Sequence, residues 1–360
     1  HLRIALSKFS GKEVQLHFNT DPQILGGIIA RVGDTIYDGA VGSGGFLVEA
    51  FEFLTKGNKK EKLSAKDWET IQNDTFFGQE KTSLGYVMGM MNMILHGIES
   101  PNVYKGNTLI QNIRDFQEKD RHNVILANPP FGGKEKRQIQ QNFPVESNAT
   151  EILFLQHFMK MLKLEGRAAI VIPEGVLFQT NNAFTKVKQT LLENFNVHTI
   201  VSLPSGVFLP YSGVKTNILY FDRKGATNDI WYYDVTPPYN LTKNKPILYE
   251  HLEEFVHLFH NPKERNHTNA KLKDAVTLSA VEDQTNTKFN DDVTLSAVEA
   301  QCNNWTLNIA DIKDYDLSAK NPHKVVEVVH QTPKDLLKVI KQNDAEINTL
   351  MKQIEQLIDG

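Results

Sequence analysis

The chain has 360 residues, of which 40% are hydrophobic and 23% charged, and its formal net charge is −4. This length allows one large domain of roughly 200–250 residues with a smaller part beside it, and the negative charge excludes a free-standing polycation that coats nucleic acid. Cys302 is the only cysteine, which excludes an intramolecular disulfide, and no apolar run approaches the ~18 residues of a membrane span, so we expect a cytoplasmic protein without membrane contact.

Short apolar strands alternate with helices from about Thr35 to Asp222. Strands are expected at residues 35–38, 75–79, 103–104, 122–127, 168–172, 197–203 and 217–222. Helices are expected at residues 46–54, 86–96, 151–164 and 182–194, and the methionines of the second, Met88, Met90, Met91 and Met93, are expected to fill the core. The alternation predicts a doubly wound, seven-stranded α/β sheet of the Rossmann-like type, with residues 35–224 as its domain.

The pattern is weaker on both sides of this domain. Residues 1–34 form a preceding segment, and residues 225–330, rich in Asn, Asp, Thr and Lys, are expected to form an irregular α+β extension. Within the extension, residues 274–282 recur almost unchanged at 291–299, which we interpret as a duplicated surface strand or loop.

Residues 331–360 predict a C-terminal helix. Thr332-Pro333 is a typical start for a helix. Apolar residues then recur at alternating spacings of four and three, in a coiled-coil seam interrupted by Asn343: Leu336, Ile340, Ile347, Leu350, Ile354 and Leu357. A regular seam at a chain end favours a helical partner over packing on its own domain.

The turn Asn128-Pro129-Pro130-Phe131 follows the apolar run of residues 124–127. An Asn side-chain oxygen and a proline carbonyl can each accept one N–H of an exocyclic amine. Proline fixes φ and offers no N–H of its own, so the turn is stiff and rich in acceptors. The aromatic ring can stack on the face of a base. The turn therefore suggests a site for methylating an amino nitrogen, and a rigid structural turn is the alternative.

A glycine loop, Asp38–Leu47, follows the first strand. Its glycines allow the backbone to approach a ligand, and the helix N-terminus after them can receive an anionic group. A dinucleotide-binding loop requires G-x-G-x-x-G, and Leu47 stands where its last glycine would be. A nicotinamide dehydrogenase is therefore disfavoured.

Together, these two motifs resemble the cofactor and catalytic loops of amino-group DNA methyltransferases. More narrowly, the chain resembles the modification (M) subunit of type I restriction–modification systems. The resemblance covers most of residues 17–222, and the stretches that carry it further are residues 78–80, 91–97, 106–109, 131–133, 166–178 and 203–222.

The resemblance implies an adenine-specific DNA methyltransferase, with S-adenosylmethionine as methyl donor and the 6-amino group of adenine in DNA as acceptor. It implies that the donor is bound by Thr20, Asp38, Gly42, Ser43, Gly44, Gly45, Phe46, Leu47, Glu80 and Asn107 or Thr108. Glu80 would accept hydrogen bonds from the ribose hydroxyls. The base would be held by Asn128, Pro129, Pro130 and Phe131. His96 and His157 have no companions at metal-ligating spacing, so no metal is expected.

The expected partners are DNA, a specificity (S) subunit docked on the C-terminal helix, a second M subunit and a restriction (R) subunit. The chain departs from the family at Gly39, Val41 and Asn107. It also lacks an arginine after Thr20, and the family's N-terminal helical region does not precede His1. A truncated or catalytically weakened scaffold subunit is therefore a second hypothesis. Methylation of a protein glutamine, which also uses an Asn-Pro-Pro-aromatic turn, is a third and is disfavoured by the long resemblance.

Overall fold

The computed structural model describes residues 30–57, 63–266 and 302–323. Residues 1–322 form one compact unit and residues 323–360 a second, so the fold below is that of the first unit. The predicted terminal helix at residues 331–360, the repeat at 274–282 and 291–299, and Thr20 lie outside the described residues.

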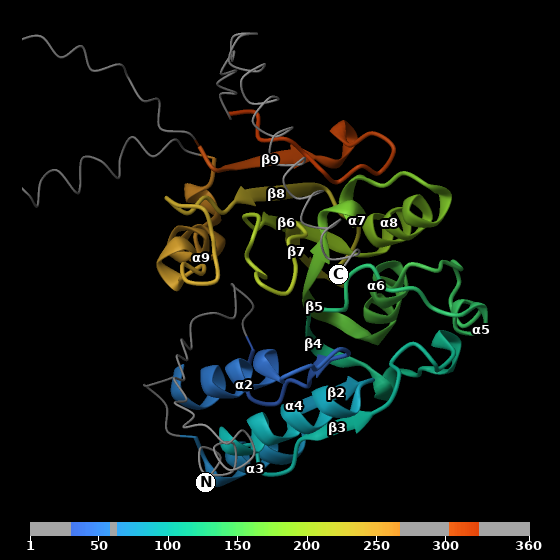
Figure 1. Cartoon of the computed structure of the whole chain (residues 1–360), viewed down its shortest axis with the longest axis vertical. Coiled ribbons are helices and arrows are strands. Elements are labelled where there is room, and N and C mark those ends of the chain that lie inside the picture. Colours follow the sequence, from blue (N-terminus) through green and yellow to red (C-terminus); the bar gives the residue numbers. More distant parts are fainter. Residues whose placement is uncertain (1–29, 58–62, 267–301, 324–360) are drawn as a thin grey trace, which may run out of the picture. The chain divides into compact units, whose positions relative to one another are not determined.

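Within the described residues, nine strands form a mixed sheet in the order β3-β2-β1-β4-β5-β7-β6-β8-β9 (Figure 1). They are β1 Ile36–Asp38, β2 Phe76–Glu80, β3 Asn102–Lys105, β4 His122–Ala127, β5 Leu162–Pro173, β6 Asn196–Ser202, β7 Thr216–Asp222, β8 Asp229–Asp234 and β9 Asn304–Asn308. Strands β1 to β5 pair in parallel, whereas β7 lies antiparallel between β5 and β6. The first seven strands overlap the seven predicted ones, although β5 begins six residues before the strand predicted at 168–172.

The prediction of a seven-stranded sheet was wrong, because β8 and β9 extend it. Strand β8 pairs in parallel with β6, and β9 pairs antiparallel with β8. Four consecutive large residues, Ile230 to Tyr233, are buried in β8. Its partner β9 lies about seventy residues later, in a segment whose composition is polar overall. Pairing over such a separation leaves no local pattern by which sequence could have found it.

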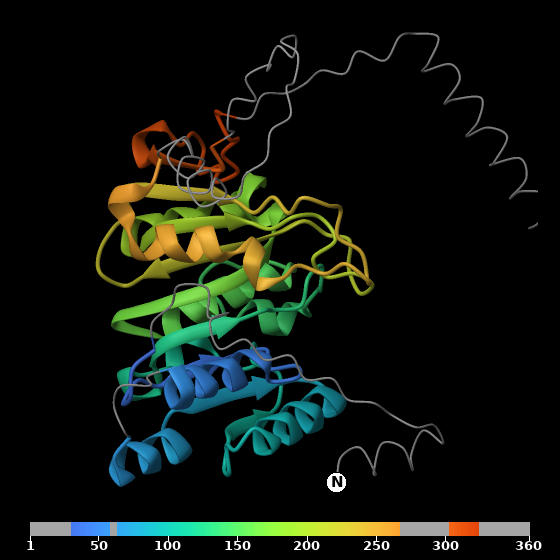
Figure 2. The same ribbon diagram turned by 90° about the vertical axis from the view of Figure 1, so that its left-hand side faces the viewer.

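Helices cover both faces of the sheet, as expected for a doubly wound fold. Residues of α2 Gly45–Glu52, α3 Ala65–Asn73, α4 Ser83–Leu95 and α9 Glu253–His260 belong to one apolar core, and those of α6 Thr150–Met161, α7 Glu174–Phe178 and α8 Asn182–Asn194 belong to the other. Figure 2 shows α9 in orange and α2 in blue on the near face of the sheet. The remaining helical segments are short: Phe53–Gly57, Ile113–Asp115, Glu118–Asp120, α5 Arg137–Gln140, Tyr249–His251, Pro262–Glu264 and Ile309–Asp311.

The helix predicted at residues 151–164 ends earlier, at Met161, and β5 begins at Leu162 without an intervening loop. Leu162 pairs with His122, and the register then shifts so that Arg167 pairs with Val124. Glu165, between the two pairs, has a φ of 58°. The apolar residues at the junction satisfy a helical pattern and a buried strand equally well, so periodicity alone misplaced the boundary.

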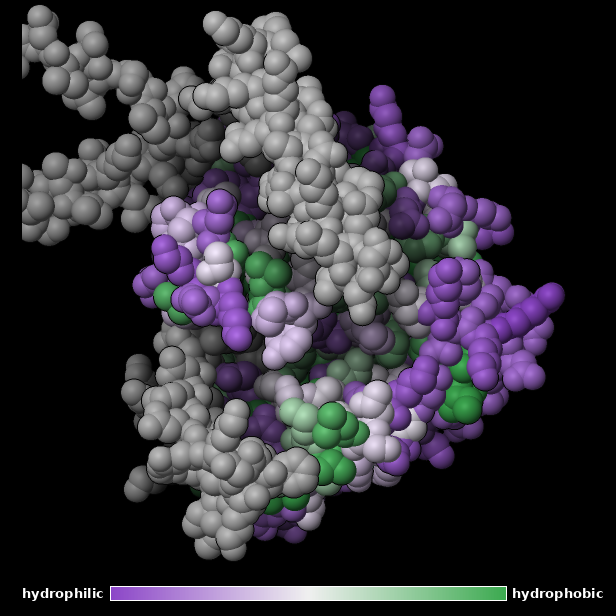
Figure 3. Space-filling view, in the orientation of Figure 1, coloured by the Kyte–Doolittle hydropathy of each residue, from purple (hydrophilic) through white to green (hydrophobic). Residues whose placement is uncertain are grey.

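The prediction that the α4 methionines fill the core holds for only part of the set. Met93 is fully buried, but Met88 and Met91 are 50% and 44% exposed. They lie on an apolar outer face of α4 with four other exposed residues, Leu84, Val87, Ile94 and Leu95. Figure 3 shows an apolar area at the place where Figure 1 draws α4. None of the described helices has both the length and the apolar character needed to cross a membrane.

Candidate active site

The predicted site residues gather at the carboxyl edge of the parallel strands. Register places Asp38, the last residue of β1, beside Gly78 of β2, two residues before Glu80. Tyr37 pairs with Ile125, so Asn128 follows β4 just beyond the level of Asp38. Glu80 in turn pairs with Lys105, which precedes Asn107 after β3. Ligands of doubly wound sheets bind at this edge.

The glycine loop leads into α2 through a left-handed turn. Gly44, the residue that caps the helix, has a φ of 77°, which is costly for any residue with a Cβ. No side chain caps the helix. The first N–H groups of α2, on Gly45, Phe46 and Leu47, can therefore receive an anionic group. The Leu47 side chain lies in the core, so this residue can offer a ligand only its backbone.

Asp38 is a buried carboxyl at the centre of the edge. It is 1% exposed, and its Oδ1 accepts a hydrogen bond from the Ala40 N–H at 2.9 Å. Burial raises its pKa to about 7. The Ala40 N–H lowers the pKa and the charge of Glu80 raises it further. The side chain is thus poised between its neutral and charged forms near neutral pH, where a cationic ligand would favour the charged form.

Glu80 is bound by groups of its own chain. One carboxylate oxygen accepts the Gly42 N–H at 3.0 Å, and the other accepts the N–H and the hydroxyl of Thr82 at 2.8 and 2.7 Å. A carboxylate has about four acceptor positions, so roughly one is left for a ligand. A ribose diol offers two hydroxyls, and the second could be accepted only if Thr82 turned away.

The segment after β3 contributes one accessible and one buried side chain. Thr108 is 4% exposed, and its hydroxyl donates a hydrogen bond to the Gly39 carbonyl at 2.6 Å. It therefore holds the start of the glycine loop in place. Asn107 is half-buried, with its Nδ2 3.5 Å from Glu135, which forms an ion pair with Lys81 at 2.9 Å. Of the two residues named for the donor's adenine ring, only Asn107 has an accessible side chain.

Val41 packs against glycines of two neighbouring elements. A Cβ on Gly78 would lie 2.4 Å from a Val41 methyl group, and one on Gly89 would lie 3.0 Å from the other. Val41 itself is 4% exposed. Glycines in β2 and α4 therefore accommodate the valine, whose side chain is directed into the core.

The turn Asn128–Phe131 contains an unusual acceptor. Pro129 is buried, Asn128 and Phe131 are half-buried, and Pro130 is exposed. The Oδ1 atom of Asn128 is shielded from solvent and has no hydrogen-bond partner among the described residues. Leaving a buried acceptor unpaired costs about 1–3 kcal/mol. Such an atom is suited to an N–H donor that a ligand would bring.

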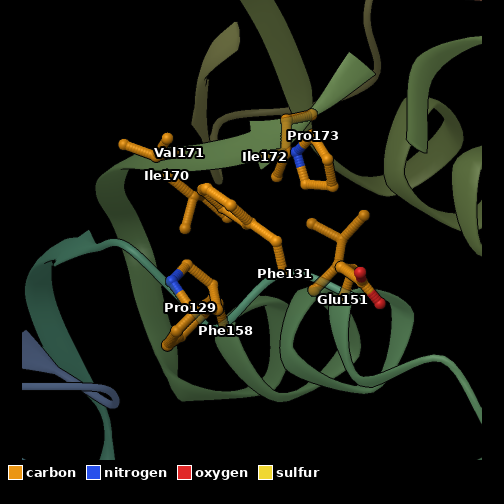
Figure 4. A pocket seen from close by; sticks show the side chains of 9 residues that line it. Pro129, Phe131, Glu151, Phe158, Ile170, Val171, Ile172 and Pro173 are labelled. Carbon is orange, nitrogen blue, oxygen red and sulfur yellow. The ribbon is translucent and has the colours of Figure 1, made fainter. Parts of the chain in front are cut away.

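Phe131 lies over the end of β5, between Pro129 and Ile172–Pro173 (Figure 4). The cavity around it has a volume of about 10 Å³, which is room for roughly one water molecule and far less than an adenine. On another side the ring meets Phe208 edge-on, at a centroid distance of 5.7 Å. Phe208 belongs to the loop between β6 and β7, and sequence reasoning did not single it out.

The turn is fastened to the start of α6. Glu151 accepts a hydrogen bond from the Gly132 N–H, and the Thr150 N–H donates to the Gly133 carbonyl at 3.2 Å. The Glu135 N–H donates to the Asn148 carbonyl at 3.0 Å. Neither Thr150 nor Glu151 was predicted as a site residue. An acidic residue at the first turn of a helix is too common to be a signal by itself.

Comparison with known proteins agrees with this geometry. The sequence profile of the family described as "N-6 DNA Methylase" matches residues 22–323. The chain belongs to the N-6 DNA methylase family. Within this family, the methylase subunit of the type I restriction enzyme EcoEI from Escherichia coli is 34% identical to it over 336 residues, and that of EcoKI from strain K12 is 30% identical over 239 residues.

A chain in a solved structure of a type I restriction–modification system is also similar, with 37% identity and a TM-score of 0.69. That match covers 95% of the present N-6 DNA methylase chain and 66% of the solved one. The matches to the EcoEI and EcoKI subunits cover 91% and 63% of the present chain but only 61% and 45% of those relatives. The chain thus spans about three fifths or less of these curated relatives.

Proposed function

We propose that this chain transfers a methyl group from S-adenosylmethionine to the 6-amino group of adenine in DNA, as the modification subunit of a type I restriction–modification complex. The observation that carries the proposal is the buried Oδ1 atom of Asn128, which has no partner among the described residues and lies in the same turn as Phe131. Family membership and the type I methylase subunits among its relatives support the substrate class.

The donor-binding residues fit a methionine-like group. The uncapped N–H groups of α2 suit its carboxylate, and Asp38 suits the positive charge of the donor. Glu80 and Asn107 would contact the nucleoside part. S-adenosylmethionine, when bound, supplies an electrophilic methyl group whose bond to sulfur breaks as the bond to the adenine nitrogen forms, with the nitrogen's proton passing to water.

The chain's own residues then hold the base. An adenine within a duplex must be turned out of the stack to reach the edge of the sheet. The cavity at Phe131 is too small for it, so the ring must shift and stack on the base instead. Asn128 Oδ1 and the Pro129 carbonyl would accept the two amino N–H groups, draw the nitrogen toward a tetrahedral shape and free its lone pair. Positioning and electrostatics supply the rate.

The proposed partners are DNA, a specificity subunit held by the C-terminal helix, a second modification subunit and a restriction subunit. Because the chain's net charge is −4, we expect a partner subunit to supply many of the positive charges that bind the DNA phosphates. A DNA substrate implies action in the cytoplasm.

Transfer of labelled methyl groups from S-adenosylmethionine tests the proposal. The chain is assayed with adenine-containing DNA, alone and with its specificity subunit, and label is expected in 6-methyladenine when both subunits are present. Label in protein but not in DNA would overturn the substrate assignment and favour glutamine methylation.

One observation favours a scaffold subunit with weak donor binding as the second candidate. The carboxylate of Glu80 is largely used by Gly42 and Thr82, which leaves little capacity for a ribose. Calorimetric titration with S-adenosylmethionine separates the two functions. Binding of the donor in the micromolar range is expected of the enzyme. No binding at millimolar donor would reject the enzyme and favour the scaffold subunit.

A further inference from the structure

A second pocket lies between the ends of α6 and α8, away from the catalytic edge. Its volume is about 480 Å³, within the range of small-molecule sites. The residues that line it are Ile113, Arg114, Arg121, Pro144, Val145, Gln156, Met159, Lys160, Val187, Thr190, Asn194, Phe195 and Arg223. Figure 1 shows α6 and α8 next to each other beside the sheet.

This pocket shares no residue with the cavity at Phe131, although both use α6. The catalytic cavity uses Glu151, Leu155 and Phe158, whereas the second pocket uses Gln156, Met159 and Lys160. The second set belongs to the C-terminal half of the helix. Arg223 follows β7, which runs antiparallel to β5 and therefore ends at the edge opposite to Asn128. The pocket is thus a separate site, near the opposite ends of the strands from Asn128.

The pocket is strongly cationic. Four of its lining residues are basic, Arg114, Arg121, Lys160 and Arg223, and none of the described residues that line it is acidic. Glu118 forms an ion pair with Arg121, but its own side chain is 64% exposed. This exposed carboxylate also acts on Arg223, whose pKa it raises, but it supplies one negative charge against four positive ones. The remaining positive charge favours an anionic ligand.

Two of these basic residues, Arg121 and Arg223, are half-buried and held in place. Arg223 donates through Nη1 to the Leu162 carbonyl at 2.8 Å, and its guanidinium lies 5.9 Å from the centre of the Phe195 ring. Burial, and after it the charge of Arg121, lowers the pKa of Arg223. The Nε atom of Arg121 is shielded from solvent and has no partner among the described residues, while the side chain as a whole is 14% exposed. Two guanidinium groups that repel each other, one with a free donor, are suited to bind a phosphate between them.

The opposite wall is apolar and rigid. The Gln156 side chain accepts the Val145 N–H at 3.0 Å and donates to the Val145 carbonyl at 2.9 Å, which fixes the loop that forms this wall. Met159 and Val187 add buried apolar surface. A ligand with a flat or apolar part joined to a phosphate would use both sides of the pocket.

We infer that this pocket binds a nucleotide, with its phosphates on Arg121 and Arg223 and its base against the wall formed by Val145 and Met159. Arg114, which is exposed, and Lys160, which is half-buried, would contact further phosphate oxygens. The inference does not rest on the proposed methyl transfer.

Isothermal titration of the full chain with ATP tests the inference. S-adenosylmethionine is present in excess, so that the adenine of ATP does not enter the donor site. We expect saturable binding of ATP, competition by pyrophosphate, and at least about tenfold weaker binding of adenosine, which lacks the charged groups. No binding of ATP or pyrophosphate at millimolar concentration would overturn the inference.

Variants assign the binding to this pocket. Arg121→Ala and Arg223→Ala should each weaken ATP binding by about tenfold or more. Lys224→Ala is the matched control, since Lys224 adjoins Arg223 but does not line the pocket and pairs with Asp222. If Arg223→Ala unfolds, the double variant Arg114→Ala/Lys160→Ala, which removes the other two basic lining residues, tests the pocket in its place. Equal loss of ATP binding in Lys224→Ala, Arg121→Ala and the double variant would contradict the assignment.

Discussion

Asn128 is the residue on which the proposed chemistry depends most directly. Its Oδ1 atom is buried without a partner, and no other role for it is visible among the described residues. The variant Asn128→Ala should reduce methyl transfer by at least about a hundredfold, which corresponds to a loss of about 2.7 kcal/mol in transition-state stabilisation. Donor affinity should stay within a factor of about two, because the proposed role of the side chain is to hold the base and not the donor. Parallel loss of transfer and donor binding would indicate a structural turn.

Asp38 should make donor binding depend on pH. Its pKa is raised to about 7, so the carboxyl is mainly neutral below this value and charged above it. The cationic donor prefers the charged form, and its affinity should therefore rise with pH, by up to about tenfold per unit below pH 7, and level off above. Calorimetric titrations at several pH values measure the profile. The variant Asp38→Asn should bind weakly with a flat profile, and an unchanged slope would assign the pH dependence to another group.

At the scale of elements, the glycine loop, β2 and α4 are fitted to one another through Val41. Gly78→Ala would bring a methyl group within 2.4 Å of Val41 and should destabilise the protein by about 1–3 kcal/mol. In the background of Val41→Ala the same change should cost clearly less. Urea unfolding of the two single variants and the double variant measures this coupling.

Gly213→Ala is the control for this cycle, because nothing lies within 4 Å of the added methyl group. It should leave the unfolding midpoint nearly unchanged. Strictly additive costs for Gly78→Ala and Val41→Ala would mean that the two positions do not share the contact.

Elements also differ in how well sequence predicts them. Strands such as His122–Ala127 and helices such as Asn182–Asn194 were predicted because their apolar residues repeat locally. Strands β8 and β9 were not, since they are stabilised mainly by partners distant in the chain. Phe208 was missed for a similar reason: its contact with Phe131 joins loops some seventy-seven positions apart.

At the scale of the whole molecule, the C-terminal seam at residues 331–360 stays a prediction, because it lies outside the described residues. If it docks the specificity subunit, the double variant Ile347→Asp/Leu350→Asp should abolish co-purification with that subunit, since two charges would enter an apolar seam. The circular dichroism and donor affinity of the isolated chain should not change. Intact assembly of the variant would reject the seam as the docking element.

The sequence by itself determined the alternating fold, the two loops that carry the chemistry and the family that they indicate, because each depends on residues close together in the chain. Only the tertiary structure decided how those residues are used. It revealed the unpaired Oδ1 of Asn128, the internal bonds of Glu80, the burial of Thr108 and the cationic pocket between α6 and α8. Each of these depends on the burial of a polar atom or on a contact between distant segments, and packing of the whole chain sets both.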